Sequence, residues 1–234
     1  MNKIQNFLLN GCSNNNDGFS NNNNTKKKNK KKILCLHGGG QECCGLPIPS
    51  ATKLNSFEYM LKDFTNDLKD DFEFIFAQSP VENNVWYKDK PGGKESTQET
   101  DEKWADDSVN YLDNLVMNTG SVDSIIAYSQ GVPMSLVLLS KRNYTPPIKL
   151  ILLNGYLPKT HKGLMELIES NSKFSNKTLI FLGKEDTNFY DLGLELENKF
   201  KDPEVLKSDK AGHGPPDKND KTYSQIIDFI KSDC

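Results

Sequence analysis

The chain has 234 residues, which suits one sizeable α/β domain around a single buried core. Residues 1–32 hold seven Lys and one Asp, a charge of +6, so residues 33–234 carry −9 of the total of −3. A domain this acidic is a poor binder of phosphate backbones, which argues against a nucleic-acid-binding function.

The N-terminal segment is rich in Asn and Lys. Residues 13–32 contain one large apolar residue, Phe19, so this segment cannot bury enough surface to offset its ordering entropy. We expect a disordered tail over residues 1–32 and one domain over residues 33–234. The cluster from Lys26 to Lys32 is best explained as part of a solubilising tail. Contact with nucleic acid, a localisation function and proximity to an anionic membrane are the alternatives.

Strand-like and helix-like segments alternate through the rest of the chain. The expected strands are residues 33–37, 72–77, 122–127, 148–153, 178–182 and 205–206, and the expected helices are residues 55–69, 104–117, 131–141, 162–169, 188–200 and 222–231. Strands separated by helices pair in parallel, with helices on both faces of the sheet. The pattern predicts an α/β fold with a mostly parallel sheet of about six strands. Ligands of such sheets bind beyond the carboxyl ends of the strands.

The third expected strand runs directly into the pentapeptide Ala127-Tyr128-Ser129-Gln130-Gly131. A strand that turns sharply into a helix exposes a serine hydroxyl at the turn, and small residues two positions before and after it let neighbouring backbone come close. This is the local structure of a nucleophile elbow. We therefore expect Ser129 to be a nucleophile.

The first expected strand ends at His37-Gly38-Gly39-Gly40-Gln41. Glycines let the backbone bend so that N–H groups point into a site, and a second oxyanion donor comes from the residue after the nucleophile. We expect the N–H groups of Gly39 and Gln130 to be the donors. Gly40 is a near-equal candidate and an expected substrate-binding residue. A flexible glycine-rich turn is the alternative, and His37 is expected to be structural.

Residues 78–100 form a long polar stretch with several Pro and Gly residues, which predicts a loop. We expect Trp86 and Tyr87, in this loop, to wall a substrate pocket. Trp104 is expected to anchor the following helix in the core.

Two further strand ends carry a carboxylate and an imidazole. Asp186 follows the fifth expected strand, and His213 lies between glycines after the last. The chain order Ser129, Asp186, His213 is that of α/β-hydrolase triads. His213 is expected to act as general base and acid, and Asp186 to fix its tautomer and stabilise the imidazolium. His161 is expected at the surface.

In several short segments the chain resembles the FSH family of serine hydrolases, in the α/β-hydrolase superfamily. The matching segments are Lys32-Ile33-Leu34-Cys35-Leu36-His37-Gly38, Gln78-Ser79-Pro80, Tyr128-Ser129-Gln130-Gly131, Asn154-Gly155-Tyr156-Leu157-Pro158, Gly183-Lys184-Glu185-Asp186 and Gly212-His213 with Pro216. The resemblance implies the α/β-hydrolase fold, with Ser129, Asp186 and His213 as triad. It also implies carboxylic-ester hydrolysis with no cofactor or metal. Ala127 stands where the family usually has Gly, and we expect its methyl group to strain the elbow slightly.

The expected activity is hydrolysis of small or medium acyl esters, with a small-molecule ester as substrate. An acyl-protein thioesterase or lysophospholipase-like enzyme is the near alternative. A non-catalytic ligand-binding protein on a hydrolase fold is the alternative from another class.

The cysteine pattern indicates the compartment. Five irregularly spaced Cys and three His give no zinc pattern and suit a reducing compartment. No stretch has the length of a membrane span. We expect a cytoplasmic location, with the nucleus as a second expected site and no stable membrane insertion. A weak mitochondrial-type presequence in residues 1–10 is a further alternative.

Overall fold

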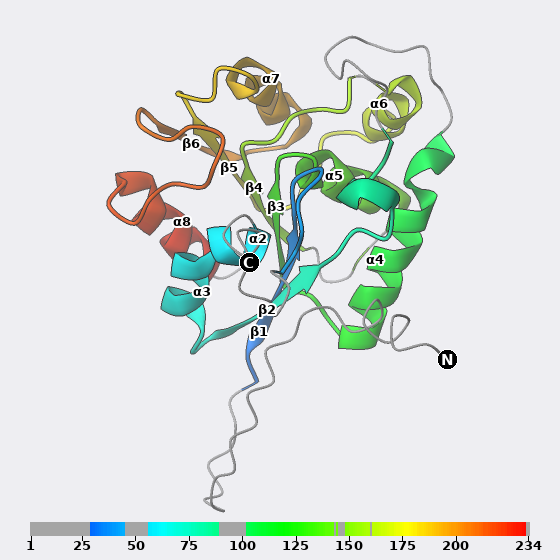
Figure 1. Cartoon of the computed structure of the whole chain (residues 1–234). Helices are drawn as coiled ribbons and strands as arrows, with labels where there is room; N and C mark the ends of the chain where they lie inside the picture. Colours follow the sequence, from blue (N-terminus) through cyan, green and yellow to red (C-terminus); the bar gives the residue numbers. More distant parts are fainter. Residues whose placement is uncertain are drawn as a thin grey trace, which may run out of the picture.

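A six-stranded, all-parallel sheet forms the centre of the protein (Figure 1). The computed structural model describes residues 29–44, 56–88, 102–142, 144, 148–159 and 161–232. The strands are β1 (Lys31–Leu36), β2 (Phe72–Ala77), β3 (Ser124–Tyr128), β4 (Lys149–Leu153), β5 (Thr178–Gly183) and β6 (Glu204–Ser208). Their order in the sheet is β2-β1-β3-β4-β5-β6. The predicted six-stranded parallel sheet is confirmed.

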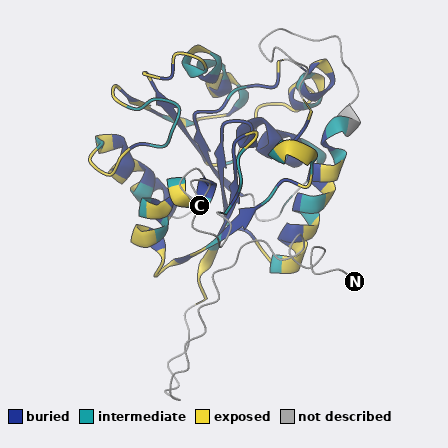
Figure 2. Ribbon diagram, viewed as in Figure 1, coloured by how far each residue is buried: buried dark blue, intermediate teal, exposed yellow. Residues whose placement is uncertain are grey.

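Helices cover both faces of this sheet because the strand residues alternate between two apolar cores. Along β3, Ile125 and Ala127 face one core while Ile126 and Tyr128 face the other. The first core is covered by α4 (Asp106–Thr119), α5 (Gly131–Lys141) and α6 (Lys162–Glu169), and the second by α2 (Phe57–Met60), α3 (Lys62–Leu68) and α8 (Lys221–Lys231). In Figure 1 these two sets of helices lie on opposite sides of the strands, and Figure 2 shows the buried sheet between them.

Two expected helices are divided in the structure. The segment 55–69 forms α2 and α3, which meet at Leu61 with a ψ of 10°. Leu61 nevertheless packs in the same core as Phe57 and Phe64, as their helical spacing predicts. The segment 188–200 forms α7 (Tyr190–Leu194) and a 3₁₀ helix, η4 (Glu195–Lys199). Two further 3₁₀ helices, η2 (Glu82–Asn84) and η3 (Glu102–Ala105), precede α4.

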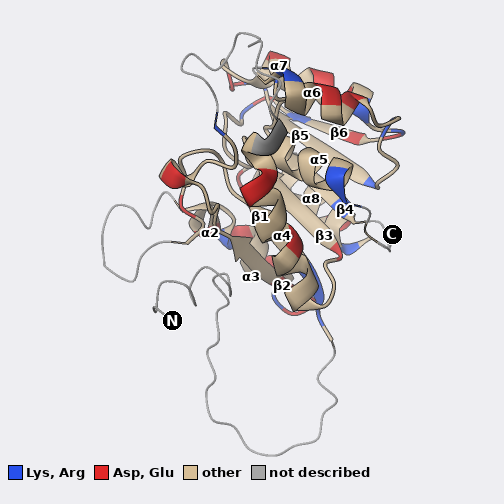
Figure 3. Cartoon of the chain, turned by 90° about the vertical axis from the view of Figure 1, so that its right-hand side faces the viewer, with Lys and Arg blue, Asp and Glu red and all other residues tan. Residues whose placement is uncertain are grey.

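The first strand begins two residues earlier than expected, at Lys31, and ends one residue earlier, at Leu36. Of the predicted tail, residues 1–28 lie outside the described residues. Charged residues lie mainly on outward helix faces, loops and strand ends (Figure 3). None of the helices in the described ranges is long and apolar enough to cross a bilayer.

Candidate active site

The turn after β3 holds Ser129 in a strained backbone conformation. Its φ is 51°, in the left-handed region that a residue with a Cβ rarely adopts. Helix α5 begins two residues later at Gly131, where a Cβ would lie 2.4 Å from the carbonyl oxygen of Leu36. Glycine is therefore needed for α5 to start this close to β1. Ala127 keeps regular pairing with Leu36, so the tight approach of this elbow lies at Gly131.

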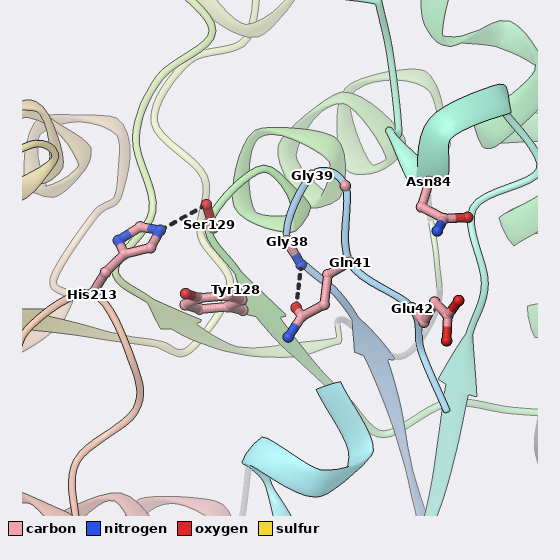
Figure 4. A pocket seen from close by; sticks show the side chains of 9 residues that line it. Gly38, Gly39, Gln41, Glu42, Asn84, Tyr128, Ser129 and His213 are labelled. Carbon is pink, nitrogen blue, oxygen red and sulfur yellow. Dashed lines mark hydrogen bonds between the residues drawn. The ribbon is translucent and has the colours of Figure 1, made fainter. Parts of the chain in front are cut away.

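The structure brings Ser129, His213 and Asp186 together from three different loops. The Ser129 hydroxyl oxygen lies 3.0 Å from Nε2 of His213, and Nδ1 of His213 lies 2.6 Å from Oδ2 of Asp186 (Figure 4 shows the first pair). Oδ1 of Asp186 accepts hydrogen bonds from the N–H groups of Asn188 and Phe189, which fix the carboxylate. This continuous chain allows a proton to pass from the hydroxyl to the imidazole while the carboxylate stabilises the resulting cation.

Two aromatic rings hold the imidazole of His213 in place. The ring of Phe189 stacks on it at 4.7 Å between centroids and an angle of 29°, and the ring of Tyr128 lies 5.1 Å away. Burial, followed by the charge of Asp186, raises the pKa of the Tyr128 hydroxyl, so that group stays neutral. Sequence reasoning did not identify Phe189, although it lies only three residues beyond Asp186.

Asn154 is a second site residue that sequence reasoning missed. Asn154 directly follows β4 and has a φ of 45°. It is almost completely buried, with 2% of its surface exposed. Its Nδ2 donates to the carbonyl oxygens of His213 and Gly214, each at 2.7 Å, and its Oδ1 accepts from the N–H of Gly183 at 2.8 Å. Asn154 therefore ties the loop that carries His213 to the end of β5.

The glycine-rich loop after β1 runs directly past the elbow. A Cβ on Gly38 would lie 3.2 Å from the Ser129 Cβ, and one on Gly39 would lie 2.9 Å from Oε1 of Gln130. The N–H of Gly40, by contrast, donates to the carbonyl oxygen of Asn84 at 2.9 Å. That bond occupies the Gly40 donor, which leaves Gly39 as the better candidate of the two in this loop.

Trp86 and Tyr87 do not line the pocket beside Ser129, contrary to expectation. Both are completely buried. The Trp86 indole N–H donates to the His37 carbonyl oxygen at 2.7 Å, and its ring lies 4.7 Å from the imidazole of His37. The Gln130 side chain accepts from the Trp86 backbone N–H at 2.9 Å, which holds this segment inward. The Trp86 ring therefore packs against His37, at the start of the glycine-rich loop, and the Tyr87 carbonyl oxygen accepts from Nε2 of Gln130.

The two remaining histidines are buried. Nε2 of His37 accepts from the N–H of Ser79 at 3.0 Å, so the ring proton is on Nδ1, 2.7 Å from the Gly38 carbonyl oxygen. Burial lowers the pKa of His37 to about 4. This geometry agrees with a structural role. The expectation of a surface position for His161 is wrong, because its side chain caps α6 through the N–H of Leu164 and packs against Trp104.

A pocket of about 410 Å³ opens in front of Ser129. It is lined by residues of the glycine-rich loop, the elbow, η2 and the His213 loop: Gly38, Gly39, Gly40, Gln41, Glu42, Asn84, Tyr128, Ser129 and His213. In Figure 4, His213 lies on one side of Ser129, and Glu42 and Asn84 lie at the opposite end. No group of three or more His, Cys, Asp or Glu side chains suited to a metal ion occurs in the described ranges.

The sequence of this chain matches one known protein family. A sequence model described as Serine hydrolase (FSH1) matches residues 26–224. A search of curated proteins finds no match.

Solved structures share the fold at low sequence identity. A carboxylesterase from Mesorhizobium loti has a TM-score of 0.59 at 13% identity, over 88% of this chain and 91% of its own. An acyl-protein thioesterase 2 from Zea mays has a TM-score of 0.57 at 16% identity, over 88% and 94%. An esterase from Exiguobacterium antarcticum has a TM-score of 0.59 at 13% identity, over 86% and 92%.

Proposed function

Since the chain belongs to the serine hydrolase (FSH1) family, we propose that it cleaves carboxylic esters of small or medium acyl chain through Ser129, His213 and Asp186. The hydrogen-bonded chain from the Ser129 hydroxyl to the Asp186 carboxylate carries this proposal. A serine hydroxyl is a poor nucleophile at neutral pH, and a positioned base removes that barrier.

The reaction has two stages. The Ser129 oxygen attacks the ester carbonyl carbon as its proton moves to Nε2 of His213, which then gives that proton to the leaving alcohol oxygen. Water next attacks the acyl-enzyme, with His213 taking and returning a proton in the same way. Asp186 holds Nδ1–H of the imidazole and stabilises its charged form in both stages.

The N–H groups of Gly39 and Gln130 are the proposed donors to the tetrahedral oxygen. Support comes from the close approach of Gly39 to the Gln130 side chain, which leaves no room for a Cβ there, and from the hydrogen bond of the Gly40 N–H to the Asn84 carbonyl oxygen. Such preorganised donors stabilise charge in the transition state at no reorganisation cost.

The proposal includes a small-molecule ester as substrate and a cytoplasmic location, which suits the buried thiol of Cys35. An acyl-protein thioesterase-like activity is the second candidate, because the thioesterase from Zea mays shares the fold. The same Ser129 and His213 would serve thioester cleavage. Matched oxygen and thiol esters of increasing acyl length separate the two, since a preference for long-chain thioesters would replace the lead proposal.

Fluorophosphonate labelling tests catalysis itself. We expect the wild-type protein to label at Ser129 and Ser129→Ala not to label. Either Ser129→Ala or His213→Ala should lower kcat for an ester by roughly 10⁴-fold or more. Equal labelling of wild type and Ser129→Ala would refute the nucleophile assignment. Absence of labelling in the wild type would favour a ligand-binding protein.

A further inference from the structure

The residue before the nucleophile, Tyr128, has a side chain that is packed on three sides. Its ring stacks on Phe57 at 5.7 Å between centroids and an angle of 19°, and it lies 5.1 Å from the ring of His213. A Cβ on Gly38 would lie 2.9 Å from Cε1 of the Tyr128 ring, so the glycine-rich loop covers the third side. The ring therefore has little freedom to move, and its hydroxyl group is held in a fixed position.

The Tyr128 hydroxyl is the part of this side chain that meets the pocket. The residue is 8% exposed and lines the pocket beside Ser129. Its hydroxyl makes no hydrogen bond within the described ranges, and its oxygen is not a buried atom. A ligand in the pocket can therefore reach it. Ligand sites combine an apolar wall with a few fixed polar groups of this kind.

The charge state of the Tyr128 hydroxyl indicates what it can bind. Burial, followed by the charge of Asp186, raises the pKa of this hydroxyl, so it keeps its proton at neutral pH and can donate a hydrogen bond. The same Asp186 carboxylate would repel an anionic acceptor. Among the described residues that line the pocket, none is a Lys or Arg that would offset this repulsion. The acceptor that suits the hydroxyl is thus an uncharged oxygen.

The contacts of Tyr128 place its hydroxyl on the leaving-group side of Ser129. The leaving alcohol oxygen must lie near Nε2 of His213, because it receives its proton from that atom. The Tyr128 ring is in contact with the His213 ring, and the charge of Asp186, the partner of His213, acts on the Tyr128 hydroxyl. In Figure 4 the hydroxyl lies at the end of the ring nearer His213. A substituent on the alcohol of a bound ester would therefore pass close to it.

We propose that the Tyr128 hydroxyl donates a hydrogen bond to an uncharged oxygen on the alcohol part of the substrate, so that the preferred substrates are esters of alkoxy- or hydroxy-substituted alcohols. This inference rests on the proposed esterase function. An ether or hydroxyl oxygen accepts the bond, whereas a plain alkyl chain covers the donor and leaves it without a partner. Tyr128 is thus a substrate-binding residue that selects the alcohol.

The test uses butanoate esters whose alcohols have equal numbers of heavy atoms. The pairs are 2-methoxyethyl against butyl and 3-methoxypropyl against pentyl, with butanoate release measured for the full-length protein. In at least one pair, Tyr128→Phe should lower the ether-to-alkyl ratio of kcat/KM by about three- to tenfold, mainly through KM. Each protein is assayed on the same two esters, so differences in the intrinsic reactivity of the alcohols cancel.

Tyr59→Phe is the matched control variant and should keep the wild-type ratio. Tyr59 is exposed on α2, outside the pocket lining, and its hydroxyl accepts from Nζ of Lys62. Tyr128→Phe should still label with a fluorophosphonate, because it keeps the ring that packs against Phe57 and His213. Failure of this variant to label would overturn the proposal, since a hydroxyl that contacts only substrate is not needed for a folded site.

The outcomes separate the alcohol preference from the esterase proposal. Equal slowing of both members of each pair by Tyr128→Phe overturns the preference alone, because the hydroxyl would then act through His213 and not on the substrate. An equal fall of the ratio in Tyr59→Phe overturns it as well. If the wild-type protein hydrolyses none of the esters and Ser129 does not label, both proposals fail.

Discussion

Replacing Asn154 by Ala should both destabilise the fold and slow catalysis. The change removes the three hydrogen bonds that tie the His213 loop to β5. Each such bond contributes about 1 kcal/mol net, and buried partners left unsatisfied cost more. Ala also tolerates the φ of 45° less well than Asn, by about 1 kcal/mol. We therefore expect a loss of about 4 kcal/mol in the free energy of unfolding, measured by urea denaturation.

Loss of the Asn154 hydrogen bonds should also slow catalysis, which can be measured independently of stability. A freer His213 loop should lower kcat by about 10- to 100-fold with little change in KM, because Asn154 is not among the residues that line the pocket. Asn154→Gly is the matched control, since it removes the same bonds but accepts the positive φ. It should be about 1 kcal/mol more stable than Asn154→Ala and equally slow. An unfolding free energy within 0.5 kcal/mol of wild type, roughly the usual range for a neutral surface change, together with an unchanged kcat, would refute the anchoring role.

Three further predictions concern the framework of the site. Gly131→Ala should lower the unfolding free energy by about 3 kcal/mol, because the new methyl meets the Leu36 carbonyl at 2.4 Å; a urea midpoint equal to wild type would contradict this. Phe189→Leu should reduce kcat more than KM, since it removes the ring stacked on His213; a change confined to KM would assign that ring to substrate binding. His37 has a pKa of about 4, against 6.5 for a free imidazole, so the unfolded chain binds a proton that the folded protein does not. Stability should therefore fall as the pH drops from 6.5 towards 4, by up to about 3 kcal/mol, and urea denaturation of His37→Gln should show a smaller slope over that range.

The parts of the site that follow directly from strand ends could be predicted from the sequence. Ser129 and Asp186 each follow a strand with a clear apolar pattern, and His213 follows the short strand expected at residues 205–206. Parallel strands bring their carboxyl ends to one edge of the sheet. Their positions thus depended only on the sheet, which the alternation of apolar segments specifies well.

The wrong expectations concerned residues whose placement depends on packing between distant segments. Trp86 lies in a polar stretch, where an exposed pocket wall was the natural interpretation. Its burial depends on Gln130, His37 and Ser108, which reach it from three other parts of the chain. His161 has polar neighbours in sequence, and only the contact with Trp104 and its capping of α6 bring it inside. The sequence around each of these residues does not determine contacts with segments that are distant along the chain.

Asn154 shows how the missed residues complete the predicted ones. Tyr128 pairs with Leu153, so Ser129 and Asn154 are the next residues of adjacent strands, and both have positive φ. One turn presents the hydroxyl to Nε2 of His213, and the other holds the backbone carbonyl of the same residue. The loops after β3, β4 and β5 thus all contact His213, which the loop after β6 carries. Because two of the three strand ends that contact His213, those of Ser129 and Asn154, have a strained backbone, we infer that this strain serves to position the base relative to the nucleophile.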